Sequence, residues 1–140
     1  MSLNLVPGGV LVSLGSDLVD VDRIRGVWDR QGERFLERVF TEEERQYCLG
    51  MKYPHKHFAA RFAAKEAVSK AFSTGIGPLL SWKSVSVYHG ERMDPRVRLD
   101  EKGQALLREA GATHVLLTLA HTDGQALAVA ALVRAEKGSP

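Results

Sequence analysis

The chain has 140 residues, of which 44% are hydrophobic and 26% are charged, a composition typical of one globular domain with a real core. Its 19 lysines and arginines nearly balance its 17 aspartates and glutamates, and the net charge of +2 gives no field that would attract a nucleic acid. No stretch approaches the roughly 20 apolar residues that span a bilayer, so we expect neither nucleic acid nor membrane as a partner.

The first residues have no basic start, and a proline and two glycines interrupt their apolar run. They do not form a signal peptide, and we expect a cytoplasmic protein. The apolar run 10–14 predicts a buried strand that Gly15 ends. A helical pattern begins near Asp20 or Asp22, either of which could cap it, and Gly32 breaks it.

Thr41 followed by Glu44 has the spacing of a capping box and predicts a short helix. The single cysteine of the chain, Cys48, lies in this helix, so no intrachain disulfide can form, which fits a reducing compartment. Residues 55–72 predict a longer helix that stops at the glycine-containing loop 73–77. This loop lacks the ending of a P-loop and is a weak phosphate signal by itself.

After this loop the hydrophobic period changes from that of helices to that of strands. Residues 85–90 alternate and predict a strand, and residues 97–99 predict its partner. A helix follows residue 100, and the apolar runs 115–120 and 126–133 predict a hairpin around a polar turn. The predicted fold is α+β, with helices early and strands late, in a single domain 1–140 whose core covers about 10–134 and whose ends 1–9 and 135–140 are loose.

Charged residues on the long helix are its most informative feature. On a helical wheel its alanines share one arc, where another backbone can approach closely; they are Ala60, Ala63, Ala64, Ala67 and Ala71. Arg61, Lys65, Glu66 and Lys70 lie outside this arc. They could be ordinary surface charges, with Glu66 and Lys70 as a favourable i,i+4 pair. Three cations and one carboxylate on a largely apolar helix could equally form a site for a polyphosphate and its metal ion.

Two distant segments carry a resemblance to a known family. Residues 15–24, Gly-Ser-Asp-Leu-Val-Asp-Val-Asp-Arg-Ile, resemble the N-terminal signature of holo-acyl-carrier-protein synthases. Residues 61–71, Arg-Phe-Ala-Ala-Lys-Glu-Ala-Val-Ser-Lys-Ala, closely match the second signature of that family. The similarity covers roughly residues 12–133. It implies a 4′-phosphopantetheinyl transferase-like fold with an antiparallel sheet packed on a long helix, in a single unit.

The resemblance also implies a reaction and a site. The 4′-phosphopantetheine of coenzyme A passes to a serine of an apo acyl carrier protein, in support of fatty-acid or polyketide synthesis, and adenosine 3′,5′-bisphosphate leaves. Asp17 and Glu66 would bind Mg²⁺, because two carboxylates completed by water and phosphate oxygens suit this ion. Glu66 and Lys70 would be catalytic, with Glu66 as first candidate for the general base. The residues implied to bind coenzyme A are Arg61, Lys65, Ser69, Gly75, His121 and Thr122.

The family further implies two kinds of protein partner. An acidic helix of the carrier would dock on a basic first helix, with Arg23, Arg30 and Arg34 as candidates. A homotrimer would complete each site between subunits, with Glu66 of one subunit facing His121 of the next. Apolar strand residues that exceed what one helix layer covers are consistent with this assembly; they are Val115, Leu117, Leu119, Leu127, Val129 and Leu132.

The sequence also allows interpretations other than a transferase. Without the family, Asp17 reads more simply as a helix cap, and His121 as a structural histidine. The chain could be a non-catalytic module that binds coenzyme A or a carrier protein. A metal-dependent nucleotide hydrolase would usually gather more carboxylates than two, and RNA binding would need aromatic residues among the arginines. The identity of the carrier, the tolerance for acyl-coenzyme A and the general base stay open.

Overall fold

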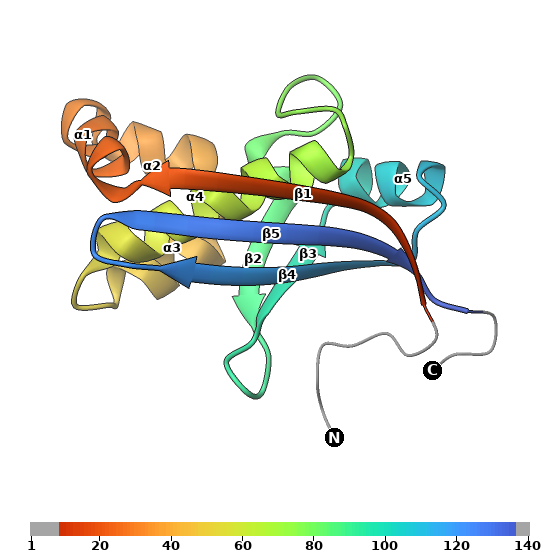
Figure 1. Cartoon of the computed structure of the whole chain (residues 1–140). Helices are drawn as coiled ribbons and strands as arrows, with labels where there is room; N and C mark the ends of the chain where they lie inside the picture. Colours follow the sequence, from red (N-terminus) through yellow and green to blue (C-terminus); the bar gives the residue numbers. More distant parts are fainter. Residues whose placement is uncertain (1–8, 137–140) are drawn as a thin grey trace.

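The computed structural model describes residues 9–136, so most of the ends predicted to be loose (1–9 and 135–140) lie outside the described residues. Its α+β architecture confirms the predicted fold class (Figure 1). None of the helices in the described range is long and apolar enough to cross a membrane. The elements are β1 Val10–Asp20, α1 Val21–Gln31, α2 Glu33–Val39, α3 Glu42–Leu49, α4 Pro54–Ala71, a 3-10 turn Trp82–Ser84, β2 Val85–His89, β3 Pro95–Leu99, α5 Glu101–Glu109, β4 His114–His121 and β5 Gln125–Arg134.

Three strands form the main sheet in the order β1-β5-β4, and both pairs are antiparallel. The predicted hairpin of β4 and β5 is therefore confirmed. Helix α4 packs along the inner face of this sheet, as Figure 1 shows, while β2 and β3 form a separate two-stranded ladder. The layers place α4 between the sheet and the shorter helices, so most of its side chains are buried in the centre of the interior.

Strand β1 does not end at Gly15 as the sequence predicts but continues to Asp20. Gly15 is required for another reason: a Cβ atom at this position would lie 2.0 Å from the backbone oxygen of Ala67 in α4. The helix therefore approaches the strand more closely than any side chain would allow. Because β1 continues to Asp20, Asp17 lies within the strand, beside Lys70 of α4, and not at the end of the strand.

The predicted alanine arc is buried against the sheet. All five of its alanines, Ala60, Ala63, Ala64, Ala67 and Ala71, are at most 3% exposed. Opposite them, the inward residues of β5 are also mostly alanines. The hydroxyl of Ser13 donates to the carbonyl of Ala71 over 2.7 Å, which fixes the end of α4 on β1. We call this junction the alanine seam.

A second helix, α2, follows α1 after Gly32, whose φ of +62° allows the chain to turn. The sequence analysis predicts a helix break at Gly32 but not the second helix. Its buried side chains, Phe35, Leu36 and Val39, complete the core beneath α4.

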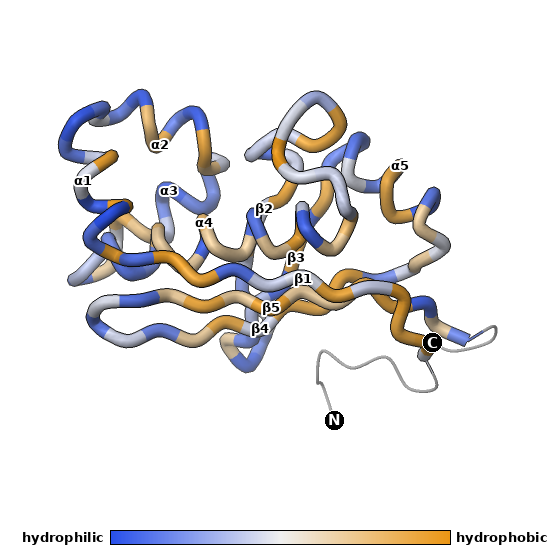
Figure 2. The backbone as a smooth tube through the Cα atoms, turned by 45° about the horizontal axis from the view of Figure 1, so that its top comes forward, coloured by the Kyte–Doolittle hydropathy of each residue, from blue (hydrophilic) through white to orange (hydrophobic). Residues whose placement is uncertain are grey.

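The outer face of the main sheet is apolar and lacks a covering helix among residues 9–136. Leu14 and Leu18 on β1 are each 58% exposed, and Leu127 on β5 is 39% exposed. Figure 2 shows the hydrophobic colouring along these strands. The sequence analysis expected six apolar strand residues to exceed what one helix layer covers. Side chains alternate between the two faces of a strand, and four of the six lie on the inner face with the buried alanines of β5, namely Val115, Leu117, Leu119 and Leu132. Only Leu127 and Val129 of the predicted six belong to the outer face, beside Leu14 and Leu18.

Candidate active site

Strand β1 and helix α4 bring Asp17, Glu66 and Lys70 together, and we call these three residues the carboxylate cluster. The ammonium of Lys70 lies 2.9 Å from a carboxylate oxygen of Asp17 and donates to the carbonyl of Ser16 over 3.1 Å. Glu66 lies one helical turn before Lys70 and is half-buried. Two segments that are 49 residues apart in sequence thus present two carboxylates and one cation to the same place.

The electrostatics of the carboxylate cluster suit a divalent cation. Partial burial and the negative charge of Asp17 raise the pKa of Glu66, while Lys70 and Arg23 oppose this shift. Two carboxylates that destabilise each other's charge gain when a cation lies between them. Within residues 9–136 no group of three or more His, Cys, Asp or Glu side chains could hold a metal, so this pair would need water or phosphate oxygens as further ligands. This donor set fits Mg²⁺.

A cavity of about 310 Å³ opens at the other end of α4, beside the ends of β2 and β4. We call it the histidine–arginine cavity, because Arg61 and three histidines line it together with Tyr47; the histidines are His57, His89 and His121. Its lining contains no carboxylate. A cavity bordered only by cationic, neutral and apolar groups favours an anionic ligand.

Arg61 forms the floor of this cavity and is only 2% exposed. One terminal nitrogen of its guanidinium lies 2.9 Å from Nε2 of His89, and the other donates to the carbonyl of His57. The central guanidinium carbon lies 4.4 Å from the ring centre of Tyr47. Its Nε atom is buried and has no hydrogen-bond partner in the described part of the chain. Within residues 9–136 Arg61 forms no ion pair, and Glu43 lines an adjacent cavity and not this one, so the histidine–arginine cavity keeps a net attraction for anions.

His121 ends β4 and is exposed, with its ring 6.0 Å from that of His57. The hydroxyl of the next residue, Thr122, accepts hydrogen bonds from the amides of Gly124 and Gln125 and so shapes the β4–β5 turn. Both residues lie at the cavity end of the sheet and remain accessible, as a ligand-binding role would require.

Three predicted coenzyme A ligands occupy other environments. Lys65 is wholly buried; its ammonium lies 2.7 Å from Glu44 and donates to the carbonyls of Trp82 and Val85. Ser69 is also buried, and its hydroxyl donates to the carbonyl of Glu66 within the helix. The donors of these two side chains are used inside the protein, so their predicted role in binding coenzyme A stays a prediction.

Gly75 has a similar structural explanation. Its φ is +64°, and its amide donates to the carbonyl of Ser69, which closes the end of α4. The amide that was expected to approach a phosphate is thus already engaged. The helix end accounts for the conformation of this glycine, and its role in binding coenzyme A stays a prediction.

A groove of about 260 Å³ lies between α1, α2, α4 and the 3-10 turn. Its floor is apolar and includes Val27, Phe62 and Trp82, while Arg23 and Arg38 stand at its edge. The predicted docking residues Arg30 and Arg34 are exposed but do not line the groove, and Arg38 does so instead.

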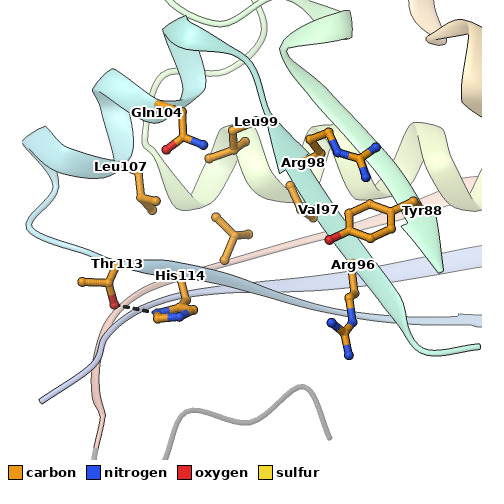
Figure 3. Close-up of a pocket in the computed structure, with 10 residues that line it drawn as sticks. Tyr88, Arg96, Val97, Arg98, Leu99, Gln104, Leu107, Thr113 and His114 are labelled. Atoms are coloured by element: carbon orange, nitrogen blue, oxygen red, sulfur yellow. Dashed lines mark hydrogen bonds between the residues drawn. The ribbon is translucent and has the colours of Figure 1, made fainter. Parts of the chain in front are cut away.

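Another hollow, of about 350 Å³, lies between β3, α5 and β4 (Figure 3), and several of its polar groups are already paired. Arg96 lies 2.8 Å from Asp94, and Arg98 lies 2.7 Å from Glu43. His114 shares a hydrogen bond with the hydroxyl of Thr113, which Figure 3 marks. These paired groups are less available for hydrogen bonds to a ligand than the groups that line the histidine–arginine cavity.

The carboxylate cluster and the histidine–arginine cavity lie at separate places in one chain. The neighbour of His121 on α4 is His57, nine residues before Glu66, which corresponds to a rise of about 13 Å. Asp17 belongs to one edge strand of the sheet, β1, and His121 to the other, β4. One subunit therefore does not bring Glu66 against His121.

The sequence analysis missed Tyr47 and His89 as cavity residues, and it assigned Glu44 to a capping box without its pair with Lys65. His89 and Tyr47 reach the cavity from elements that only tertiary packing brings to α4, so no local pattern indicates them. His57 had a usable signal, because it lies four residues before Arg61 and hence on the same helix face.

Comparison with known proteins identifies the class. A sequence model of the 4′-phosphopantetheinyl transferase superfamily matches residues 13–130, and the chain belongs to this family. Within it, the chain is similar to a holo-[acyl-carrier-protein] synthase of Chlamydia trachomatis, with 45% identity over 120 residues that cover 86% of this chain and 98% of that protein. The corresponding synthase of Caldanaerobacter subterraneus is 38% identical over 125 residues, covering 89% and 97%.

Solved structures agree with the sequence comparison. The holo-[acyl-carrier-protein] synthase of Neisseria meningitidis superposes with a TM-score of 0.82 at 28% identity, covering 88% of this chain and 98% of that one. The synthase of Bacillus anthracis in complex with coenzyme A (3′,5′-ADP) has a TM-score of 0.75 at 31% identity, covering 89% and 98%. The predicted 4′-phosphopantetheinyl transferase-like fold is thus confirmed.

Proposed function

We propose that the carboxylate cluster and the histidine–arginine cavity are the two halves of a site for phosphopantetheine transfer. The chain transfers 4′-phosphopantetheine from coenzyme A to a serine of an apo acyl carrier protein, as its similarity to holo-acyl-carrier-protein synthases over 86% of its length indicates. The main observation in support of this proposal is that Asp17 on β1 lies close to Glu66 and Lys70 on α4. A non-catalytic module is not favoured, because it would not need this set.

The carboxylate cluster supports the chemical step. Asp17 and Glu66 would hold Mg²⁺, which supplies charge neutralisation on the pyrophosphate when bound. The carrier serine forms a new O–P bond to the β-phosphorus while the bond to the bridging oxygen of the leaving bisphosphate breaks. Glu66, whose pKa is raised, is the candidate to accept the serine proton. Lys70 can move from Asp17 to a phosphate oxygen, since half of its side chain is exposed.

The histidine–arginine cavity would hold the nucleotide end of coenzyme A. Arg61, His121 and Thr122 are its expected ligands from the sequence analysis, and the first two line one cavity with no carboxylate. Coenzyme A carries a phosphomonoester on its ribose in addition to the pyrophosphate. A buried guanidinium without a carboxylate partner is suited to such a dianion.

The groove along α1 would receive the carrier protein. Its occupant is an acidic amphipathic helix beside the acceptor serine, because an apolar floor with Arg23 and Arg38 at its edge complements such a helix. Arg23 also influences Glu66, so the groove ends close to the carboxylate cluster. Arg30 and Arg34 would contribute long-range attraction from the exposed sides of α1 and α2.

A homotrimer would join the two halves of the site. The outer face of the sheet offers Leu14, Leu18 and Leu127 to a neighbour, and these are among the exposed large apolar residues of the chain. A heterologous contact through this face closes into a ring when three subunits meet. We place the reaction in the cytoplasm, where a lone buried thiol such as Cys48 stays reduced.

An intact-mass assay tests the proposed transfer. The chain, coenzyme A, Mg²⁺ and a panel of apo carrier proteins should give a carrier heavier by one phosphopantetheine, and the panel identifies the carrier served. Asp17→Asn and Glu66→Gln keep shape but remove charge, so each should lower the rate at least about a hundredfold. Chelation of Mg²⁺ should have the same effect. If either variant keeps full activity, the substituted residue does not bind the metal. If the wild type modifies none of the carriers, the proposed function is refuted.

A further inference from the structure

The histidine–arginine cavity contains two histidines to which the proposed transfer assigns no role. We infer that His89 orients Arg61 while neutral, and that His57 becomes a second cation toward the ribose phosphomonoester when it is protonated. Affinity for this phosphate then rises as the pH falls toward the titration range of histidine. This inference rests on the proposed function, because it concerns the nucleotide end of the same substrate.

His89 is fixed as an acceptor by its two contacts. Its Nδ1 lies 3.1 Å from the carbonyl of Met93, and a carbonyl can only accept, so Nδ1 carries the hydrogen. Its Nε2 lies 2.9 Å from Arg61, which can only donate, so Nε2 is unprotonated. A neutral imidazole in this tautomer satisfies both neighbours. It also holds the guanidinium in the floor of the cavity.

His57 has a different environment. Its ring lines the cavity, lies 6.0 Å from the ring of His121, and makes no hydrogen bond to any other residue in the range 9–136. The side chain is partly exposed, so a protonated ring keeps access to water. Its two ring nitrogens are therefore available to a ligand, while both nitrogens of His89 are occupied.

Charged and titratable groups surround His57 on several elements. Lys56 and Arg61 lie on its own helix, His89 on β2, His121 at the end of β4 and Tyr47 on α3, and Lys56 pairs with the carboxylate of Asp123. Partial burial and then the positive charge of Arg61 lower the pKa of His57 in the free protein. A bound dianion reverses the local charge and raises this pKa, so binding takes up a proton at a pH between the two values.

The sign of the pH effect follows. Above the pKa of the bound state His57 is neutral and adds nothing electrostatic. Below it, the imidazolium donates a charge-assisted hydrogen bond, which is worth about a tenfold gain in affinity. The ligand's own phosphate titrates near pH 6 as well, but it does so equally for every protein variant. The informative quantity is therefore the affinity ratio between the wild type and a His57 variant.

Calorimetry with adenosine 3′,5′-bisphosphate as the probe tests the inference on the full chain. In buffers of different ionisation enthalpy, the wild type should take up more protons with this ligand than with adenosine 5′-monophosphate, which lacks the second phosphate. His57→Gln should abolish the difference. Its affinity for the bisphosphate should be about tenfold weaker than wild type at pH 6 and nearly equal to it at pH 8.5.

Matched variants give the controls. His55→Gln changes another half-buried histidine of α4, whose ring packs 4.9 Å from Trp28 away from the cavity, and should bind like wild type at both pH values. His89→Phe removes the acceptor of Arg61 and should weaken binding equally at pH 6 and pH 8.5. Equal proton uptake with both nucleotides, or a His57→Gln effect independent of pH, would overturn the inference while carrier modification continued. Loss of carrier modification in the wild type would instead refute the proposed function.

Discussion

At the scale of single residues, Gly15 illustrates how one missing side chain can set the distance between two elements. A Cβ there would lie 2.0 Å from the oxygen of Ala67 and 2.6 Å from the nitrogen of Ala71. Both are backbone atoms of α4, and they cannot move aside as the end of a flexible side chain would. The strand and the helix must separate if this position carries a methyl group.

Gly15→Ala should therefore lower the free energy of unfolding by at least about 3 kcal/mol, at the upper end of the usual cost of overpacking. Chemical denaturation measures the loss. Gly77→Ala is the matched control, since nothing lies within 4 Å of a Cβ at that position, and its stability should stay within about 0.5 kcal/mol of wild type. If Gly15→Ala left the free energy of unfolding unchanged, α4 could not lie this close to β1.

The sequence pattern predicted the positions of the charged residues on α4 more accurately than it predicted their partners. The helical wheel placed Arg61 and Lys65 outside the alanine arc, and both are buried in the structure. It could not reveal that Lys65 meets Glu44, because that partner comes from another helix. Burial of a charged side chain depends on tertiary partners, which a single helix does not contain.

At the scale of elements, Glu44 connects three of them. One of its oxygens accepts from the amide of Thr41 in the predicted capping box and lies 2.7 Å from Lys65 on α4. The other accepts from the amide of Val87 on β2 over 2.9 Å. Glu44 and Lys65 are both fully buried, so the pair replaces water with protein partners on every side.

Glu44→Ala should destabilise the protein by about 3–5 kcal/mol, because it leaves the ammonium of Lys65 buried without its carboxylate. The double variant Glu44→Leu/Lys65→Met removes both charges and should recover part of this loss. Glu43→Gln is the control: its pair with Arg98 is more than half exposed on both sides and should contribute under about 1 kcal/mol. Denaturation curves of the four proteins provide the comparison. A double variant less stable than Glu44→Ala would contradict this account.

The order of elements was predictable from hydrophobic period and capping signals, with α2 as the main omission. The capping box at Thr41 and Glu44 is confirmed, as are the long helix and the β4–β5 hairpin. The end of β1 was predicted wrongly, because a glycine usually interrupts a strand, whereas Gly15 serves a close contact with α4.

At the scale of the whole molecule, the two half-sites lie at opposite edge strands of the sheet. The carboxylate cluster adjoins β1 and the histidine–arginine cavity adjoins β4. In the proposed trimer, Glu66 would meet His121 across the interface between two subunits. Family resemblance suggested this arrangement, and no property of a single sequence could have indicated which faces meet.

Coexpression of two inactive variants tests the shared site. Glu66→Gln and His121→Ala damage different half-sites, so mixed trimers should regain part of the activity, because some interfaces join two intact halves. Asp17→Asn with Glu66→Gln is the matched control, because both damage the carboxylate cluster and no interface then has an intact one. Light scattering should give the mass of a trimer. A monomer that transfers phosphopantetheine, or recovery in both mixtures, would contradict an intersubunit site.

The alanine seam has a consequence for the entropy of folding. Gly15 and the five alanines of α4 have no side-chain rotamers to lose, so ordering them costs only backbone freedom. Leucines or methionines would bury more apolar area, but each would also give up rotational freedom on folding. The seam thus gains close dispersion contacts without this cost, and it has no alternative rotamers through which the helix could shift. Glu66 and Lys70 extend from a helix whose position on β1 varies little, which keeps the carboxylate cluster preorganised.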